Sequence, residues 1–83
     1  MITVYTKYLC IWCDRAKAFL KNNGIKFKDV NVMEDKKAMD FVISQGHRTL
    51  PQIYHNDKVI SGGYTGLTKL KEGKLEELKN DIK

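Results

Sequence analysis

The sequence predicts a single α/β domain over residues 1–83, built on a four-stranded mixed sheet with helices against it. Three observations support this prediction. The chain has 83 residues, which is enough for one hydrophobic core but not for two. Short segments rich in β-branched and aromatic residues alternate with segments whose apolar residues recur at helical spacing. A strand, a helix and a second strand in that order form a βαβ unit, whose two strands run parallel.

The first half of the chain predicts this βαβ unit and a second helix. Ile2–Thr6 alternates apolar and polar residues and is the expected first strand. Residues 12–22 carry apolar side chains at helical spacing, and residues 26–32 form the expected second strand. Asp35 suits the N-cap of a helix over residues 36–44. The predicted inner face of that helix carries Ala38, Met39, Val42 and Ile43.

The second half predicts a hairpin and two short helices. Residues 52–55 and 58–61 are the expected strands, and the Asn-Asp pair between them fits a two-residue hairpin turn. Residues 64–70 form a short helix after a double glycine. A last helix covers residues 75–82, with Leu75, Leu78 and Ile82 on one face. The order is β-α-β-α-β-β-α plus a short terminal helix, which a mixed sheet between helices accommodates.

Charge and hydropathy limit the function classes. Thirteen lysines and two arginines face ten acidic residues, for a net charge of +5. The lysines are scattered among acidic residues without a nucleic-acid-binding motif, which indicates a solvated surface with a mild preference for acidic partners. No apolar run is long enough for a signal peptide or a membrane span. We therefore expect a cytoplasmic protein with neither a nucleic acid nor a membrane as partner.

The two cysteines carry the most specific chemistry. A disulfide between Cys10 and Cys13 closes almost no loop, so it would stabilise the fold little, and redox chemistry explains the pair better. This C-x-x-C pair lies where a strand ends and a helix begins, and there the free N–H groups and the helix dipole stabilise a thiolate. We expect Cys10 to be the exposed nucleophile with a lowered pKa. Cys13, one turn into the helix, is expected to be more buried and to resolve the mixed disulfide.

A structural disulfide and a zinc site are the alternatives for this pair. A closed zinc site needs four ligands, and His47 and His55 are the only histidines in the sequence, at a spacing not typical of ligands. We therefore expect no metal.

Three further residues have more than one interpretation. Trp12, between the cysteines, is either a core residue or part of the active-site wall, and its place just after the first cysteine of the motif favours a wall against which a flat peptide or thiol lies. Ile11 is either ordinary exposed surface or an apolar rim that keeps water from the attacked disulfide. Pro51 is by itself a strand opener, and the sequence gives no reason to expect a cis bond before it.

Short segments along nearly the whole chain together resemble the glutaredoxin family, and most of all the short dithiol glutaredoxins of bacteria and phages. The resemblance implies the thioredoxin fold, one glutaredoxin domain, and dithiol–disulfide oxidoreductase activity with glutathione as the reductant. It also implies a monomer that reduces glutathione mixed disulfides and protein disulfides, with ribonucleotide reductase as a candidate substrate. The matching segments are Tyr5-Thr6-Lys7, Cys10-Ile11-Trp12-Cys13, Arg15-Ala16-Lys17, Arg48-Thr49-Leu50-Pro51-Gln52-Ile53 and Gly62-Gly63.

A glutathione site is also implied by the resemblance. Lys7 would hold a glutathione carboxylate and help to stabilise the Cys10 thiolate. The bond before Pro51 would be cis and would place the backbone of Leu50 next to Cys10, where it pairs with glutathione like an added strand. Trp12 stands where the family usually has a tyrosine. The double glycine would let the backbone approach the γ-glutamyl end of glutathione. The remaining implied contacts come from Thr49, Gly63, Tyr64 and Thr65.

Departures from the family pattern leave alternatives open. The usual Pro-Tyr between the cysteines is Ile-Trp here, and uncharged Thr65 stands where the family often has an aspartate, which predicts weaker glutathione binding. Residues 44–51 also resemble small redoxins that serve ribonucleotide reductase and take electrons from thioredoxin reductase. Lys7 and the double glycine favour glutathione. A third interpretation, an iron–sulfur cluster bridged in a dimer by the first cysteine and glutathione, is disfavoured by the presence of Cys13.

Overall fold

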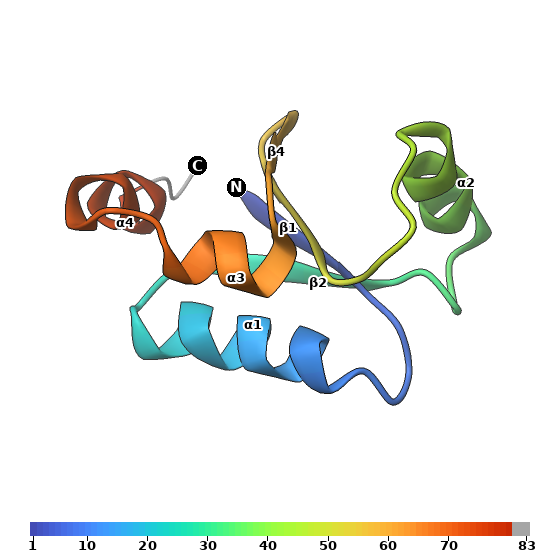
Figure 1. The fold of residues 1–83 in the computed structure, drawn as a ribbon, viewed down its shortest axis with the longest axis horizontal. Helices are drawn as coiled ribbons and strands as arrows, with labels where there is room; N and C mark the ends of the chain where they lie inside the picture. Colours follow the sequence, from blue (N-terminus) through green and yellow to red (C-terminus); the bar gives the residue numbers. More distant parts are fainter. Residues whose placement is uncertain (81–83) are drawn as a thin grey trace.

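The strands form one mixed sheet in the order β2-β1-β3-β4 in the computed structural model, which describes residues 1–80 (Figure 1). β1 runs parallel to β2 and antiparallel to β3, and β3 runs antiparallel to β4. The predicted fold class is therefore confirmed. The strands are β1 Ile2–Thr6, β2 Phe27–Asn31, β3 Gln52–His55 and β4 Lys58–Ile60. The helices are α1 Ile11–Asn22, α2 Lys36–Ser44, α3 Gly63–Thr68 and α4 Glu72–Lys79.

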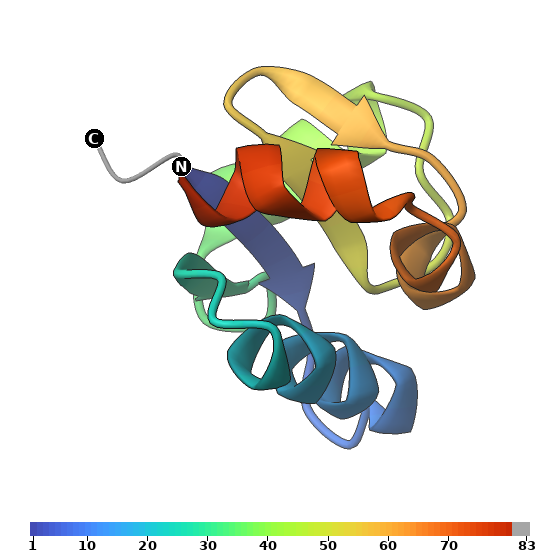
Figure 2. The same ribbon diagram turned by 90° about the vertical axis from the view of Figure 1, so that its left-hand side faces the viewer.

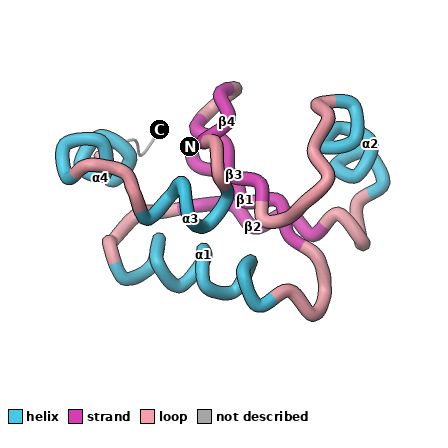
Figure 3. The backbone as a smooth tube through the Cα atoms, viewed as in Figure 1, coloured by secondary structure: helices cyan, strands magenta, loops and turns pink. Residues whose placement is uncertain are grey.

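Two apolar clusters follow from the alternation of residues along β1. Ile2 and Val4 belong to the larger cluster, in which α1, α3 and α4 contribute Ala16, Leu20, Leu67 and Leu78. Tyr5 belongs to the second cluster, which α2 covers through Val42 and its neighbours. Figure 3 shows α1 and α3 side by side, with α2 away from both, and Figure 2 views the molecule from the side of α4. No helix within residues 1–80 has the length and apolar character needed to cross a membrane.

Helix α2 has the predicted bounds, but its inner face differs from the prediction at one position. The Asp35 side chain caps the helix by accepting a hydrogen bond from the Ala38 N–H at 3.1 Å. Ala38 and Val42 are buried as predicted, whereas Ile43 is 62% exposed. Successive residues in a helix are rotated by about 100°, which turns Ile43 away when Val42 faces the sheet. The ring of Phe41 packs against the second cluster instead.

The C-terminal helices are displaced from their predicted bounds. α3 begins and ends earlier than predicted, and α4 begins at Glu72, so that Gly73 lies inside the helix. Leu78 is fully buried and Leu75 packs against the larger cluster, as predicted. The prediction for Ile82 lies outside the described residues.

Gly66 joins α3 closely to the end of β4. A Cβ atom at this position would overlap the carbonyl oxygen of Ser61 and lie 2.7 Å from its carbonyl carbon. We expect Gly66→Ala to lower the free energy of unfolding by about 2 kcal/mol, because the backbone must shift to admit the methyl group. Urea unfolding measures this change. Gly73→Ala is the matched control: the space around Gly73 is open, so alanine there should stabilise the helix by about 0.5–1 kcal/mol. A similar change in both variants would contradict this role of Gly66.

Candidate active site

Cys10 lies at the junction that the spacing of the cysteines predicts. It is the N-cap residue of α1, and its Sγ accepts a hydrogen bond from the backbone N–H of Cys13 at 3.1 Å. The two residues form a disulfide, with their Cα atoms 5.2 Å apart. Because Cys10 sits where the free N–H groups of α1 point, reduction of this disulfide leaves its sulfur in surroundings that stabilise a negative charge.

The burial of the two sulfur-bearing residues follows the predicted order but not the predicted extent. Cys13 is 1% exposed and Cys10 is 7% exposed. The expectation of an exposed Cys10 is therefore wrong for the oxidised protein. The cause is tertiary: the carbonyl oxygen of Leu50 lies 4.0 Å from the Cys10 sulfur. The peptide bond between Leu50 and Pro51 is cis, as the resemblance implies.

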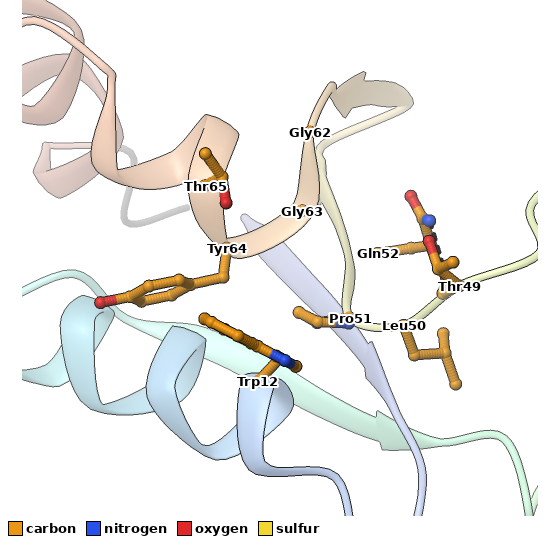
Figure 4. A pocket seen from close by; sticks show the side chains of 9 residues that line it. All are labelled: Trp12, Thr49, Leu50, Pro51, Gln52, Gly62, Gly63, Tyr64 and Thr65. Carbon is orange, nitrogen blue, oxygen red and sulfur yellow. Dashed lines mark hydrogen bonds between the residues drawn. The ribbon is translucent and has the colours of Figure 1, made fainter.

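A groove with a volume of about 320 Å³ opens next to the start of α1 (Figure 4). Its walls come from three separate parts of the chain: Trp12 in α1, the segment that leads into β3, and the start of α3. Since these parts are distant in sequence, only the folded sheet brings them together. The lining residues are Trp12, Thr49, Leu50, Pro51, Gln52, Gly62, Gly63, Tyr64 and Thr65.

An aromatic wall borders this groove. Trp12 is half-exposed, and its ring centroid lies 5.7 Å from that of Tyr64, which Figure 4 shows above it. The guanidinium of Arg15, one helical turn further on, lies 4.8 Å from the centroid of the Trp12 ring. A cation over an aromatic ring at this distance is attractive. Arg15 and Tyr64 therefore hold an exposed tryptophan in place beside the disulfide.

The start of α3 approaches the segment before β3 closely enough to require glycine. Gly63 has a φ of +56°, and a Cβ atom there would lie 3.1 Å from the carbonyl oxygen of Pro51. Gly62 has a φ of +91°. Both conformations are accessible to glycine at little cost. The double glycine thus lets the start of α3 lie against the segment that leads into β3, and both glycines line the groove.

The groove gathers seven of the eight residues predicted to contact glutathione, and Lys7 is the exception. Lys7 is exposed in the loop after β1 and does not line the groove. Two contributors were given no role by sequence reasoning, although both lie in segments that carry the family resemblance. The buried Gln52 donates a hydrogen bond from its side-chain amide to the carbonyl oxygen of Thr49 at 2.8 Å and so fixes the groove edge. Arg15 is the other, and its spacing of three residues from Trp12 was the available signal.

The positive charge of Lys17 in α1 is neutralised in part by the carboxylate of Asp29. Burial raises the pKa of Asp29, but hydrogen bonds from the Thr6 hydroxyl at 2.7 Å and from Lys17 Nζ at 3.0 Å outweigh it, and the net pKa is lowered. The ionised Asp29 therefore holds the ammonium of Lys17. Arg15, two residues before Lys17 in α1, lies over the ring of Trp12 instead.

Metal binding finds no support in the described part of the chain. Within residues 1–80, no three His, Cys, Asp or Glu side chains are grouped so that they could hold a metal ion. His47 instead lies with a ring nitrogen 2.7 Å from the hydroxyl of Tyr54.

Comparison with known proteins gives a consistent set of relatives. The family model described as Glutaredoxin matches residues 2–60. A glutaredoxin-like protein NrdH of Lactococcus lactis is 36% identical over 62 residues, which is 75% of this chain and 86% of the relative. A probable glutaredoxin of Synechocystis is 36% identical over 63 residues, covering 74% of this chain and 72% of the relative.

The solved structures that resemble this chain include proteins of the same two names. The glutaredoxin-like protein NrdH-redoxin from Escherichia coli, described as having a thioredoxin-like activity profile, matches with a TM-score of 0.73 and 31% identity over 84% of this chain and 93% of its own. A wheat glutaredoxin matches with a TM-score of 0.79 and 26% identity over 99% of this chain and 81% of its own.

Proposed function

This chain belongs to the glutaredoxin family of thiol–disulfide oxidoreductases, and from that premise we propose that glutathione is its reductant and that the groove beside Cys10 binds the glutathione moiety. The redox-active disulfide is Cys10–Cys13. The proposed setting is a reducing cytoplasm. The proposed substrates are glutathione mixed disulfides and protein disulfides, with that of ribonucleotide reductase as a candidate.

In the proposed reaction, the Cys10 thiolate attacks one sulfur of the substrate disulfide. The S–S bond breaks, the other sulfur leaves with the electron pair and takes up a proton, and a mixed disulfide with Cys10 forms. The Cys13 thiolate then attacks the Cys10 sulfur, which releases the second substrate sulfur as a thiol and forms Cys10–Cys13. Two electrons have passed to the substrate, and the enzyme is oxidised.

Glutathione would return these electrons in two steps. One glutathione thiolate attacks the Cys10 sulfur, so that Cys13 leaves as a thiol and Cys10 carries a glutathionyl group. A second glutathione thiolate attacks the sulfur of that group, which releases glutathione disulfide and restores the Cys10 thiolate. The atoms and the two electrons balance, and two glutathione molecules are consumed in each cycle.

The observation that carries the proposal is the groove itself. Leu50 lines it, and the carbonyl oxygen of Leu50 lies 4.0 Å from the Cys10 sulfur. One edge is formed by Thr49 and Leu50, which lead into a strand, and a backbone edge of this kind can pair with an extended peptide. Trp12 supplies a flat apolar wall on another side. A short peptide thiol bound along this edge would place its sulfur against Cys10. The net charge of +5 also favours an anionic peptide such as glutathione.

Thr65 is the position at which this site can be strengthened. We expect Thr65→Asp to lower the KM for a glutathionylated peptide about fivefold, or about 1 kcal/mol, because the new carboxylate would face the glutathione ammonium. The gain should shrink with added salt, since the site lies at the surface. The measurement is steady-state kinetics at two salt concentrations. Thr68→Asp is the matched control, since Thr68 lies on the same helix but does not line the groove. No change in KM with Thr65→Asp would count against glutathione binding in the groove.

A second candidate function follows from the comparisons. Relatives at 36% identity are named glutaredoxin-like protein NrdH, and the Escherichia coli structure is described by its thioredoxin-like activity profile. In this alternative the chemistry of Cys10 and Cys13 is unchanged, but thioredoxin reductase reduces the disulfide. The two candidates differ in the electron donor, which a coupled assay distinguishes.

A further inference from the structure

Leu9, the residue before Cys10, has a backbone conformation that leucine rarely adopts. Its φ is +54°, in the left-handed region. Asn56 is the other non-glycine residue with positive φ among residues 1–80, and it lies in the β3–β4 turn. Asparagine and glycine adopt this conformation readily, whereas a leucine there is strained. The chain therefore bears a cost at Leu9 that another residue would avoid.

The Leu9 side chain is not packed against the rest of the fold, so no burial of apolar surface offsets this cost. It is fully exposed, at 104% of its reference area, and its neighbour Ile11 is 60% exposed. The loop is held from the other side, where the Tyr8 hydroxyl donates a hydrogen bond to the Glu34 carboxylate. A backbone outlier next to a reacting residue, with no stabilising contact of its own, points to a function outside the folded chain.

Leu9 and Ile11 flank Cys10 in the sequence, yet neither lines the groove. A glutathionyl group in the groove would thus leave both side chains uncovered. A longer polypeptide whose disulfide lies against Cys10 would extend past the groove and reach them. An apolar side chain next to the substrate cysteine would cover Leu9 and remove it from water.

We propose that Leu9 is a specificity-determining contact for protein disulfides and contributes little to the reduction of small ones. The inference rests on the proposed attack of Cys10 on a disulfide, but it does not depend on which donor reduces the enzyme afterwards. The occupant is a polypeptide segment with an apolar residue beside its cysteine. Leu9 touches this segment and takes no part in the transfer of electrons or protons.

The test uses the full chain, reduced beforehand and freed of reductant, with rates of its oxidation followed by acid quench and thiol alkylation. Insulin is the protein disulfide and bis(2-hydroxyethyl) disulfide is the small one. Leu9→Asn keeps a residue that tolerates the backbone conformation but removes the apolar side chain. We expect its second-order rate with insulin to fall about fivefold, with the rate for the small disulfide within about twofold of wild type. Its Tm should equal or exceed that of wild type.

Two further variants control the result. Leu9→Met retains an apolar side chain and should keep the wild-type rate with insulin. Ile43→Asn removes another exposed apolar side chain, on α2 away from Cys10, and should leave both rates unchanged. An unchanged insulin rate in Leu9→Asn, or an equal fall for both disulfides, would overturn the proposal. Because no donor is present, failure here is distinct from failure of the glutathione proposal.

Discussion

Replacing Cys10 with serine should abolish the reduction of every disulfide substrate. Cys10 is the cysteine at the N-cap of α1, and Cys13, at 1% exposure, is closed to a substrate sulfur. Serine does not form the nucleophilic anion at neutral pH without an adjacent base. We expect residual activity below about one per cent of wild type with a glutathionylated peptide and with insulin.

The fold should survive this change, because the disulfide joins residues three positions apart and closes almost no loop. A circular dichroism spectrum like that of the reduced wild type is therefore the control. Retention of more than a few per cent of the activity by a folded Cys10→Ser protein would show that another residue is the nucleophile.

Replacing Cys13 with serine should separate the two substrate classes. A mixed disulfide between Cys10 and glutathione can be resolved by a second glutathione, so removal of glutathione from a peptide should continue at a rate within about threefold of wild type. Reduction of a protein disulfide needs Cys13 to release the bound protein, and that rate should fall at least about tenfold. Steady-state assays with a glutathionylated peptide and with insulin measure the two rates.

Cys10→Ser measured beside it is the matched control, since it should lose both activities. If Cys13→Ser lost both activities equally, Cys13 would be needed for more than resolution. If it lost neither, the proposed division of roles between the cysteines would be wrong.

Local sequence patterns predicted most of the fold, because most strands and helices here are determined by the alternation of apolar residues and by capping side chains. Alternation placed β1 and β3 at their observed bounds, and the Asp35 side chain fixed the start of α2. The errors occur where tertiary contacts decide. Ile43 was predicted to lie on the buried face of α2 but is exposed. Cys10 was predicted to be exposed but is buried, with the carbonyl group of Leu50, forty residues further along the chain, against its sulfur.

The site was predicted in part, for a related reason. The C-x-x-C motif by itself indicates thiol–disulfide chemistry. The family resemblance identified the two other segments that line the groove, which are the segment before β3 and the start of α3. The stacking of Arg15 on Trp12 and the hydrogen bond of Gln52 depend on side-chain placement in three dimensions. The φ of Leu9 has no signature in the sequence, since leucine is not a residue expected in that conformation.

We have proposed that glutathione, bound in the groove beside Cys10, supplies the electrons. One coupled assay tests it most directly, with consumption of NADPH followed in two arrangements: glutathione with glutathione reductase, and thioredoxin reductase alone. We expect sustained turnover of bis(2-hydroxyethyl) disulfide with glutathione and its reductase, and little with thioredoxin reductase. Turnover with thioredoxin reductase and none with glutathione would contradict it and would establish the second candidate function.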